Sequence, residues 1–478
     1  MGHRDIREFI AKLEEEGELH RIKAEVDWDL ELSAIMRKVF EKNGPACLFE
    51  NVKDSEFSVF TGGFFRHKKY GLAVDAPPDI RSILQKMIKA TESPITPVLV
   101  DNGPCKENID LDDKIDVGKF PVPRWFHLDG GRYIGTLGSI ITKDPDTGIR
   151  NMGVYRQMIA GKNKLGMLAT QQCGINLQKY RARNKPMPIA TAIGVPPAVL
   201  ASAIVRAPYG LDELGIAGAI TGEPIPLVKC ETIDLEVPAF SEIVLEGEIP
   251  PDSSLWVEEG PFGEFTGYCS SVKSEMKPVV NLSAVTYRDD PIFQGCSPGI
   301  PPNEETTYRE IGTTVGAWRN ILNAGVPGIK EVYATEMGCA EFVIVVSMDQ
   351  QYFLGNAREV IEAVFATVGK TCKWVIVVDD DIDIFDRGQL EWALSVRVQP
   401  HRDIIITDDR HSGNPLDPSI HPDLRRHALL AQGSRIGIDA TIKNKDYEFP
   451  PIVKSTEEME ELVERRWAEY GFKGRGKK

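Results

Sequence analysis

The chain has 478 residues, of which 42% are apolar and 27% charged, as is typical of a soluble globular protein with about three domains. Its formal net charge of −15 argues against nucleic-acid binding, and no apolar run approaches the ~18 residues of a membrane-spanning helix. The eight cysteines form no C-x-x-C pair. We therefore expect neither a zinc finger nor a disulfide framework, but reduced thiols in a cytoplasmic protein.

The N-terminal quarter of the chain combines helical and strand patterns. Asp5 is placed to cap a helix with an apolar stripe of Ile6, Phe9, Ile10 and Leu13. Further along, the apolar spacing predicts a half-buried strand at 22–26, a helix at 30–40 and a strand at 46–49. This quarter therefore reads as a small α/β unit.

From Phe120 to Phe293 the segments become short, rich in β-branched residues and punctuated by glycine and proline. The predicted elements are strands at 138–142, 189–193, 227–230 and 278–283, and a small-residue helix at 198–205. Frequent turns between short strands favour a barrel or a sandwich.

From Glu331 onward, buried strands alternate with amphipathic helices. The predicted order is strand 341–346, helix 356–368, strand 374–378, helix 389–396 and strand 404–406. This order predicts a parallel sheet with right-handed crossovers. Three acids, Asp379 to Asp381, follow the second strand, and a solvated loop is a simpler interpretation of them than a metal site.

The stretch 455–470 predicts a terminal amphipathic helix, with a capping box from Ser455 to Glu458.

The segment most suggestive of chemistry places two acids, Glu259 and Glu264, on either side of a Gly-Pro-Phe-Gly turn. Proline and glycine disfavour a helix here, so the segment is expected to fold back and bring the carboxylates together. Close like charges separate the pKa values of an acid pair, which lets one acid keep a proton near neutral pH. A surface turn with solvated acids is the alternative.

Three other segments contain residues suited to binding anions or cations. Arg156 lies in an apolar strand pattern at 151–157, where it needs an anionic partner, either a structural carboxylate or a ligand. Asp212 and Glu213 precede a small-residue run, and one of them is a candidate helix cap. The Gly-Ser-Arg sequence ending at Arg435 has groups that suit a phosphate.

Together these segments resemble one family, the UbiD-like (de)carboxylases that use prenylated FMN. The resemblance extends over nearly the whole chain and is carried by ordered blocks at 151–157, 161–165, 228–239, 242–247, 259–264, 299–304 and 375–381. It implies a multidomain fold of mixed α/β and β type. The implied parts are an N-terminal α/β domain (1–112), a central split β-barrel that binds prenylated FMN (113–300), a connecting segment (301–328), a C-terminal α/β oligomerisation domain with parallel strands (329–440), and a C-terminal linker and helix (441–478).

The resemblance also assigns site residues. The family's catalytic Glu-Arg-Glu trio falls on Arg156, Glu259 and Glu264. The positions that contact the cofactor are Asn151, Arg156, Gln171, Gln172, Ser202, Glu213 and Arg435. Among these, the ligands of a divalent ion, usually Mn²⁺, are Asn151, Gln172 and Glu213, with K⁺ as an optional second ion. Two residues depart from the family pattern: Gln172 replaces a histidine, and Arg435 stands where relatives have lysine.

The implied activity is reversible, non-oxidative decarboxylation of an aromatic, heteroaromatic or α,β-unsaturated carboxylic acid. Glu264 would be the proton donor and Arg156 would pair with Glu259. The implied partners are a small carboxylic acid as substrate and a flavin prenyltransferase as cofactor supplier, in a cytoplasmic homodimer or homohexamer. Two alternatives remain open: an FMN-binding oxidoreductase, although no G-x-G-x-x-G follows a predicted strand, and a non-catalytic flavin-binding subunit of a carboxylase complex.

Overall fold

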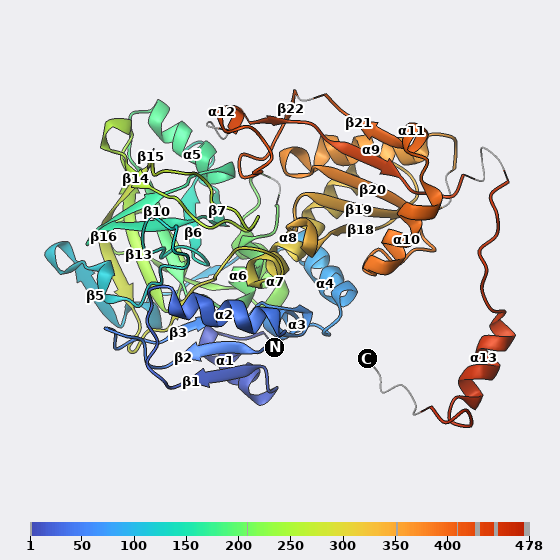
Figure 1. The fold of residues 1–478 in the computed structure, drawn as a ribbon. Coiled ribbons are helices and arrows are strands. Elements are labelled where there is room, and N and C mark those ends of the chain that lie inside the picture. Colours follow the sequence, from blue (N-terminus) through green and yellow to red (C-terminus); the bar gives the residue numbers. More distant parts are fainter. Residues whose placement is uncertain are drawn as a thin grey trace.

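A computed structural model describes residues 2–207, 209–349, 352–408, 410–425, 431–443 and 448–472. Figure 1 shows an N-terminal unit and a central β-rich unit side by side, with a C-terminal α/β unit next to them. A helix near the C-terminus stands clear of this body on an extended arm. The mixed multidomain fold expected from the sequence is confirmed.

The N-terminal unit contains α1 (Ile6–Glu15), β1 (Leu19–Ile22), α2 (Glu31–Glu41), β2 (Ala46–Phe49), β3 (Val59–Thr61), α3 (His67–Val74) and α4 (Ile80–Glu92). Asp5 caps α1 as predicted, because its Oδ1 accepts the Glu8 N–H at 2.9 Å. The strand predicted at 22–26 begins earlier, at Leu19, because its backbone pairs in parallel with the buried strand β2 over residues 19–22. Pairing with a neighbour, and not local alternation, decided where this strand lies.

The central unit contains β4 (Val98–Leu99), β5 (Asn108–Leu111), β6 (Ser139–Lys143), β7 (Arg150–Val154), β8 (Gln157–Gly161), β9 (Lys164–Met167), α5 (Gln171–Ala182), β10 (Met187–Ile193), α6 (Pro197–Ala203), α7 (Glu213–Thr221), β11 (Pro226–Lys229), β12 (Glu236–Pro238), β13 (Ile243–Ile249), β14 (Val257–Glu259), β15 (Glu275–Lys277), β16 (Val279–Tyr287) and β17 (Phe293–Gln294). Its main sheet has the order β7-β6-β10-β13-β16-β9-β8, with β5 also paired to β16, and forms a half-barrel. β17 crosses to the N-terminal sheet, where it pairs with β3.

The C-terminal unit contains α8 (Glu304–Asn323), β18 (Ile329–Ala334), β19 (Val343–Met348), α9 (Asn356–Thr367), β20 (Trp374–Asp379), α10 (Arg387–Arg397), α11 (Pro400–Asp403), β21 (Ile404–Ile406), β22 (His411–Ser412), α12 (Pro422–Arg425), β23 (Gln432–Gly433) and β24 (Ile436–Asp439). The sheet order is β18-β19-β20-β24-β21. β19 and β20 are parallel as predicted, but β21 is antiparallel to its neighbour β24, so the prediction was wrong for this strand. The later strand β24 takes the inner position beside β20 and leaves β21 at the edge.

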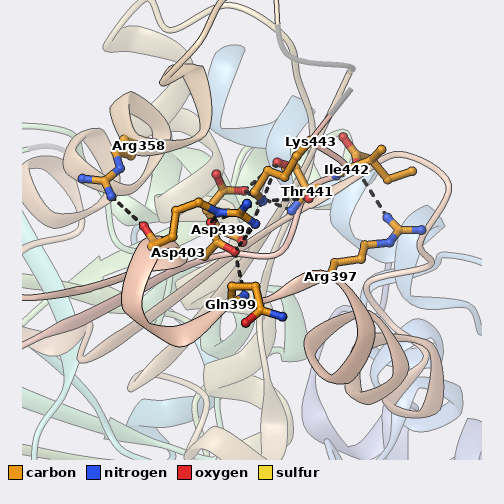
Figure 2. Close-up of polar contacts among 10 residues, drawn as sticks. Arg358, Arg397, Gln399, Asp403, Asp439, Thr441, Ile442 and Lys443 are labelled. Atoms are coloured by element: carbon orange, nitrogen blue, oxygen red, sulfur yellow. Dashed lines mark hydrogen bonds and ion pairs between the residues drawn. The ribbon is translucent and has the colours of Figure 1, made fainter. Parts of the chain in front are cut away.

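A charged cluster gathers where β20 and β24 end. Asp379 is buried and contacts the buried Arg397, which also binds Asp381 at 2.7 Å, so the solvated-loop interpretation was wrong for Asp379. Beside this pair, Lys443 Nζ lies 2.9 Å from Asp439 Oδ1 and 2.7 Å from the Thr441 carbonyl oxygen. Figure 2 shows these three residues together. Within the described ranges, no group of three or more His, Cys, Asp or Glu side chains could hold a metal ion. The cluster therefore joins the strand ends through ion pairs.

The terminal helix α13 (Glu457–Arg466) forms as predicted, but Thr456 caps it in place of Ser455 by accepting the Met459 N–H at 3.3 Å. None of the residues of α13 is buried, and its apolar Met459 and Val463 are exposed. Among the described residues, no helix has the length and apolarity needed to cross a bilayer.

Candidate active site

The acidic turn folds back as its composition predicts. β14 ends at Glu259, and Gly260 adopts a positive φ of 86°, which glycine reaches without strain. The Glu264 N–H donates to the Tyr268 carbonyl at 2.9 Å, and the Ser270 N–H donates to the Phe262 carbonyl at 2.8 Å. The returning chain is thereby fixed beside the outgoing one, and both acids face the same region.

Arg156 joins the two acids. It lies in the short link between β7 and β8, not within a strand as the sequence pattern suggested. Its Nε and Nη2 bind the two carboxylate oxygens of Glu259 at 2.8 and 2.9 Å, and its Nη1 contacts Glu264 Oε1. The Arg156 side chain is 9% exposed, and the acid side chains are 0% and 6% exposed. The structure thus brings the three predicted residues together in one buried cluster.

Glu259 and Glu264 differ in their neighbouring charges and in their hydrogen-bond donors. Burial raises the pKa of Glu264 to about 7, with a further increase from the negative charge of Glu305 and an opposing decrease from Arg156. Glu259 has the fuller set of donors, because the Tyr133 hydroxyl adds a bond of 2.9 Å to the two from Arg156. A pKa of about 7 allows Glu264 to change its protonation state near neutral pH.

The trio lies on the wall of a cavity of about 410 Å³ between the central and C-terminal units. From the central unit its lining includes Tyr155, Leu168, Gln171, Phe262 and Phe265, and from the C-terminal unit Glu341, Thr371, Asn414 and Leu416. Pro298 also lines the cavity, whereas the nearby Phe293 and Cys296 are buried in the core.

A second cluster of charged residues on the cavity wall was not predicted from the sequence. Arg309 Nε binds Glu305 at 2.7 Å, and its Nη1 binds Glu341 at 2.7 Å, while Arg206 also binds Glu341 at 2.7 Å. Glu305 and Arg309 are four residues apart on α8, and this spacing in a sequence predicts an ordinary ion pair on an exposed helix surface. Only the packing of α8 against two other units places this pair in a cavity.

The predicted metal ligands also converge. Asn151 Nδ2 lies 2.8 Å from Gln172 Oε1 and 3.4 Å from Glu213 Oε1, and the Met152 N–H donates to Glu213 Oε2 at 2.8 Å. Asn151 Oδ1 is buried and has no hydrogen-bond donor, and burial raises the pKa of Glu213 to about 8. An amide oxygen without a donor, a second amide oxygen and a desolvated carboxylate suit a hard divalent cation. Asp212 instead caps α7 through the Leu214 N–H.

The other three predicted cofactor contacts are placed differently from one another. Gln171 lines the cavity at the start of α5. Ser202 is fully buried in α6, where its hydroxyl donates to the Val199 carbonyl at 2.8 Å. Arg435 donates to the carbonyls of Phe365 and Ser412, and neither Ser202 nor Arg435 borders the cavity. The roles of these residues therefore stay predictions.

The chain matches the models of three domains of 3-octaprenyl-4-hydroxybenzoate carboxy-lyase. The N-terminal domain matches residues 10–87, the Rift-related domain residues 98–301 and the C-terminal domain residues 311–440. Among curated proteins, the pyrrole-2-carboxylic acid decarboxylase of Pseudomonas aeruginosa is 32% identical over 508 residues, covering 98% of this chain and 98% of the relative.

Solved structures give the same result. The UbiD-class enzyme HmfF of Pelotomaculum thermopropionicum, solved with FMN, has a TM-score of 0.82 at 35% identity and covers 94% of this chain and 97% of its own. The closed form of the vanillic acid decarboxylase of Sedimentibacter hydroxybenzoicus has a TM-score of 0.89 at 30% identity, covering 99% and 100%. By sequence and fold alike, the chain belongs to the UbiD family of carboxy-lyases.

Proposed function

We propose that the chain catalyses the reversible, non-oxidative decarboxylation of an aromatic, heteroaromatic or α,β-unsaturated carboxylic acid. The observation that carries this proposal is the contact of Arg156 with both Glu259 and Glu264 on the wall of one cavity. Replacing a carboxyl group by hydrogen requires a cation to orient the carboxylate and an acid to supply the proton. The trio provides both.

Each member of the trio has a distinct role. Arg156 would orient the substrate carboxylate through its guanidinium, and Glu259 would keep that guanidinium in place through the two-bond fork. Glu264, whose pKa burial raises to about 7, would donate the proton to the carbon that loses CO₂. In the carboxylation direction, the same carboxylate would remove that proton.

Prenylated FMN, when bound, would supply the ring that accepts the electron pair left by the departing CO₂. The flavin complexes of UbiD-class relatives support this choice of cofactor. Asn151, Gln172 and Glu213 would hold a divalent ion, Mn²⁺ by family likeness, through oxygen donors. Gln171 would contact the cofactor from the cavity wall, with K⁺ as an optional further ion.

We further propose that the protein is a cytoplasmic homo-oligomer supplied with its cofactor by a flavin prenyltransferase. The exposed apolar side chains of Met459 and Val463 on α13 support an assembly in which this helix packs on a neighbouring copy. Light scattering of the full chain beside a Met459→Glu, Val463→Glu variant would test the assembly. Equal masses for the two proteins would contradict it.

The function is tested by loading the purified chain with prenylated FMN and Mn²⁺ and measuring CO₂ release from a panel of aromatic and acrylic acids. The same protein loaded with plain FMN is the control. Turnover that requires the prenylated cofactor supports the proposal. NAD(P)H oxidation without CO₂ release would favour an oxidoreductase, and inactivity of the loaded chain would favour a non-catalytic subunit.

A further inference from the structure

The acidic turn packs against a second loop, residues 125–133, which runs beside it. The Gly130 N–H donates to the Pro261 carbonyl at 2.9 Å. A Cβ at Gly130 would lie 2.0 Å from the Gly260 carbonyl oxygen, so any larger residue would push the two backbones apart. The two loops are thus in direct backbone contact, and the position of one depends on the other.

Asp129 forms a second tie between the loops. Its Oδ1 accepts the Gly263 N–H at 2.8 Å, and its Oδ2 accepts the Phe126 N–H at 2.9 Å. The residue is 5% exposed. A carboxylate has an acceptor oxygen for each of these donors, whereas the amide of asparagine has only one. Asp129 therefore connects its own loop to the residue that immediately precedes Glu264.

Tyr133 forms the third tie, at the other end of the turn. Its hydroxyl lies 2.9 Å from Glu259 Oε1 and 3.1 Å from the Pro261 carbonyl oxygen, and its ring centroid is 4.3 Å from that of Phe262. The hydroxyl has one proton, which it donates to one of these acceptors at a time. Tyr133 thus holds both the carboxylate of Glu259 and the turn backbone.

We propose that Asp129 and Tyr133 are positioning residues that hold the acidic turn closed, so that Glu264 stays buried against Arg156. Neither residue touches the reacting atoms, so each acts through the turn. The inference rests on the proposed function for its catalytic meaning, but the burial of Glu264 is measurable without turnover.

The expected consequence follows from the surroundings of the two acids. Arg156, Glu259, Glu305 and Arg309 face Glu264, and burial is the main reason that the pKa of Glu264 rises to about 7. The charged groups that face Asp129 are Arg156 and Arg124, and the Cys269 thiol lies close to both acids. Loosening the turn admits water to Glu264, which lowers its pKa towards the ordinary value of a glutamate.

The test is an infrared titration of the full-length protein, following the carboxyl band that disappears in Glu264→Gln. In Asp129→Asn we expect the titration midpoint of this band to fall by about one pH unit, because water would partly solvate the Glu264 carboxyl group. In Tyr133→Phe the midpoint should move in the same direction. Tyr70→Phe is the matched control, because the Tyr70 hydroxyl is buried without a hydrogen-bond partner and lies in the N-terminal unit.

Wild-type midpoints in both folded variants would overturn the proposal, and so would an equal shift in Tyr70→Phe. If Asp129→Asn does not fold, Tyr133→Phe carries the test by itself. In the loaded enzyme, the high-pH limb of kcat should move down with the infrared midpoint. Inactivity of the loaded wild type together with a shifted midpoint would remove the proposed function while leaving the positioning role intact.

Discussion

Arg156 and Glu259 form a two-bond fork, with Nε to Oε1 at 2.8 Å and Nη2 to Oε2 at 2.9 Å. This geometry uses both oxygens of one acid and leaves the second acid, Glu264, with a contact to Nη1 alone. Arg156 therefore binds Glu259 through two nitrogens and contacts Glu264 through one. In the proposed mechanism this difference separates an anchoring acid, Glu259, from a proton-donating acid, Glu264, and the predictions on catalysis follow from it.

Replacing Glu264 by glutamine removes the exchangeable proton but keeps the shape of the side chain. We expect kcat to fall by about 10²–10⁴, the usual contribution of a general acid, with little change in cofactor content. Single-turnover measurements on the loaded variant, with flavin absorbance to measure loading, would check this. Full turnover by Glu264→Gln would rule out the proton-donor role.

The pH dependence of decarboxylation should follow Glu264. The group donates only while protonated, and its pKa is about 7, so kcat should be highest below that pH and fall as the pH rises through it. Glu305→Gln removes a negative charge that raises the Glu264 pKa, so this variant should shift the limb to lower pH. The profile of kcat against pH, measured for wild type and for Glu305→Gln, tests both expectations. A shift of the fall in kcat to higher pH in Glu305→Gln would contradict the assignment of this fall to Glu264.

Removing the guanidinium of Arg156 should affect both substrate binding and folding. Arg156→Ala leaves a buried, unpaired Glu259, which typically costs about 3–5 kcal/mol in the free energy of unfolding. KM should rise and kcat fall together. Arg156→Lys keeps the charge but loses the fork, so it should recover stability better than activity. Arg21→Ala is the surface control, since exposed ion pairs contribute about 0–1 kcal/mol, and unchanged kinetics in Arg156→Ala would refute the role.

Loss of the carboxylate of Glu213 should weaken divalent-ion binding. We expect Glu213→Gln to lower Mn²⁺ affinity by about tenfold or more, measured by electron paramagnetic resonance titration of the flavin-loaded protein. Asp212→Asn is the matched control, because the neighbouring acid binds Arg150 at 2.7 Å and caps α7. Equal affinities in the two variants would show that the ion is bound elsewhere.

The buried Glu304 should make stability depend on pH. Its carboxylate accepts the N–H groups of Gly62 and Phe64 at 2.7 and 3.0 Å, and burial raises its pKa from 4.5 to about 7. Because the folded state holds this proton more tightly, the contribution is fully present below about pH 4.5 and is lost as the pH rises to about 7. The contribution of this proton to the free energy of unfolding amounts to about 1–3 kcal/mol.

Denaturant unfolding at a series of pH values would measure this loss, and Glu304→Gln is the variant that cannot titrate. We expect the fall in unfolding free energy across this window to be smaller in Glu304→Gln than in wild type. An identical pH dependence in the two proteins would assign the effect to another group.

Much of the secondary structure could be predicted from the sequence, because it is locally encoded. The cap at Asp5, the strand at 46–49 and the turn after Glu259 each depend on residues within a few positions of one another. The ordered blocks also predicted the family, and the structure brings together the residues predicted as the trio and those predicted as ion ligands, whose roles stay predictions.

Other features depended on contacts between residues far apart in the chain. The direction of β21 was decided by β24, which arrives about thirty residues later, and the start of β1 was decided by pairing with β2. Glu305 and Arg309 have the spacing of an exposed helix pair, and only the packing of α8 against the rest of the protein places them on the cavity wall, where Arg309 binds Glu341. Sequence alone determined which charged groups the protein has, and the tertiary structure decided which of them lose water. The sequence led us to expect a raised pKa from two neighbouring acids, but the main cause of the raised Glu264 pKa is desolvation, which is a property of packing.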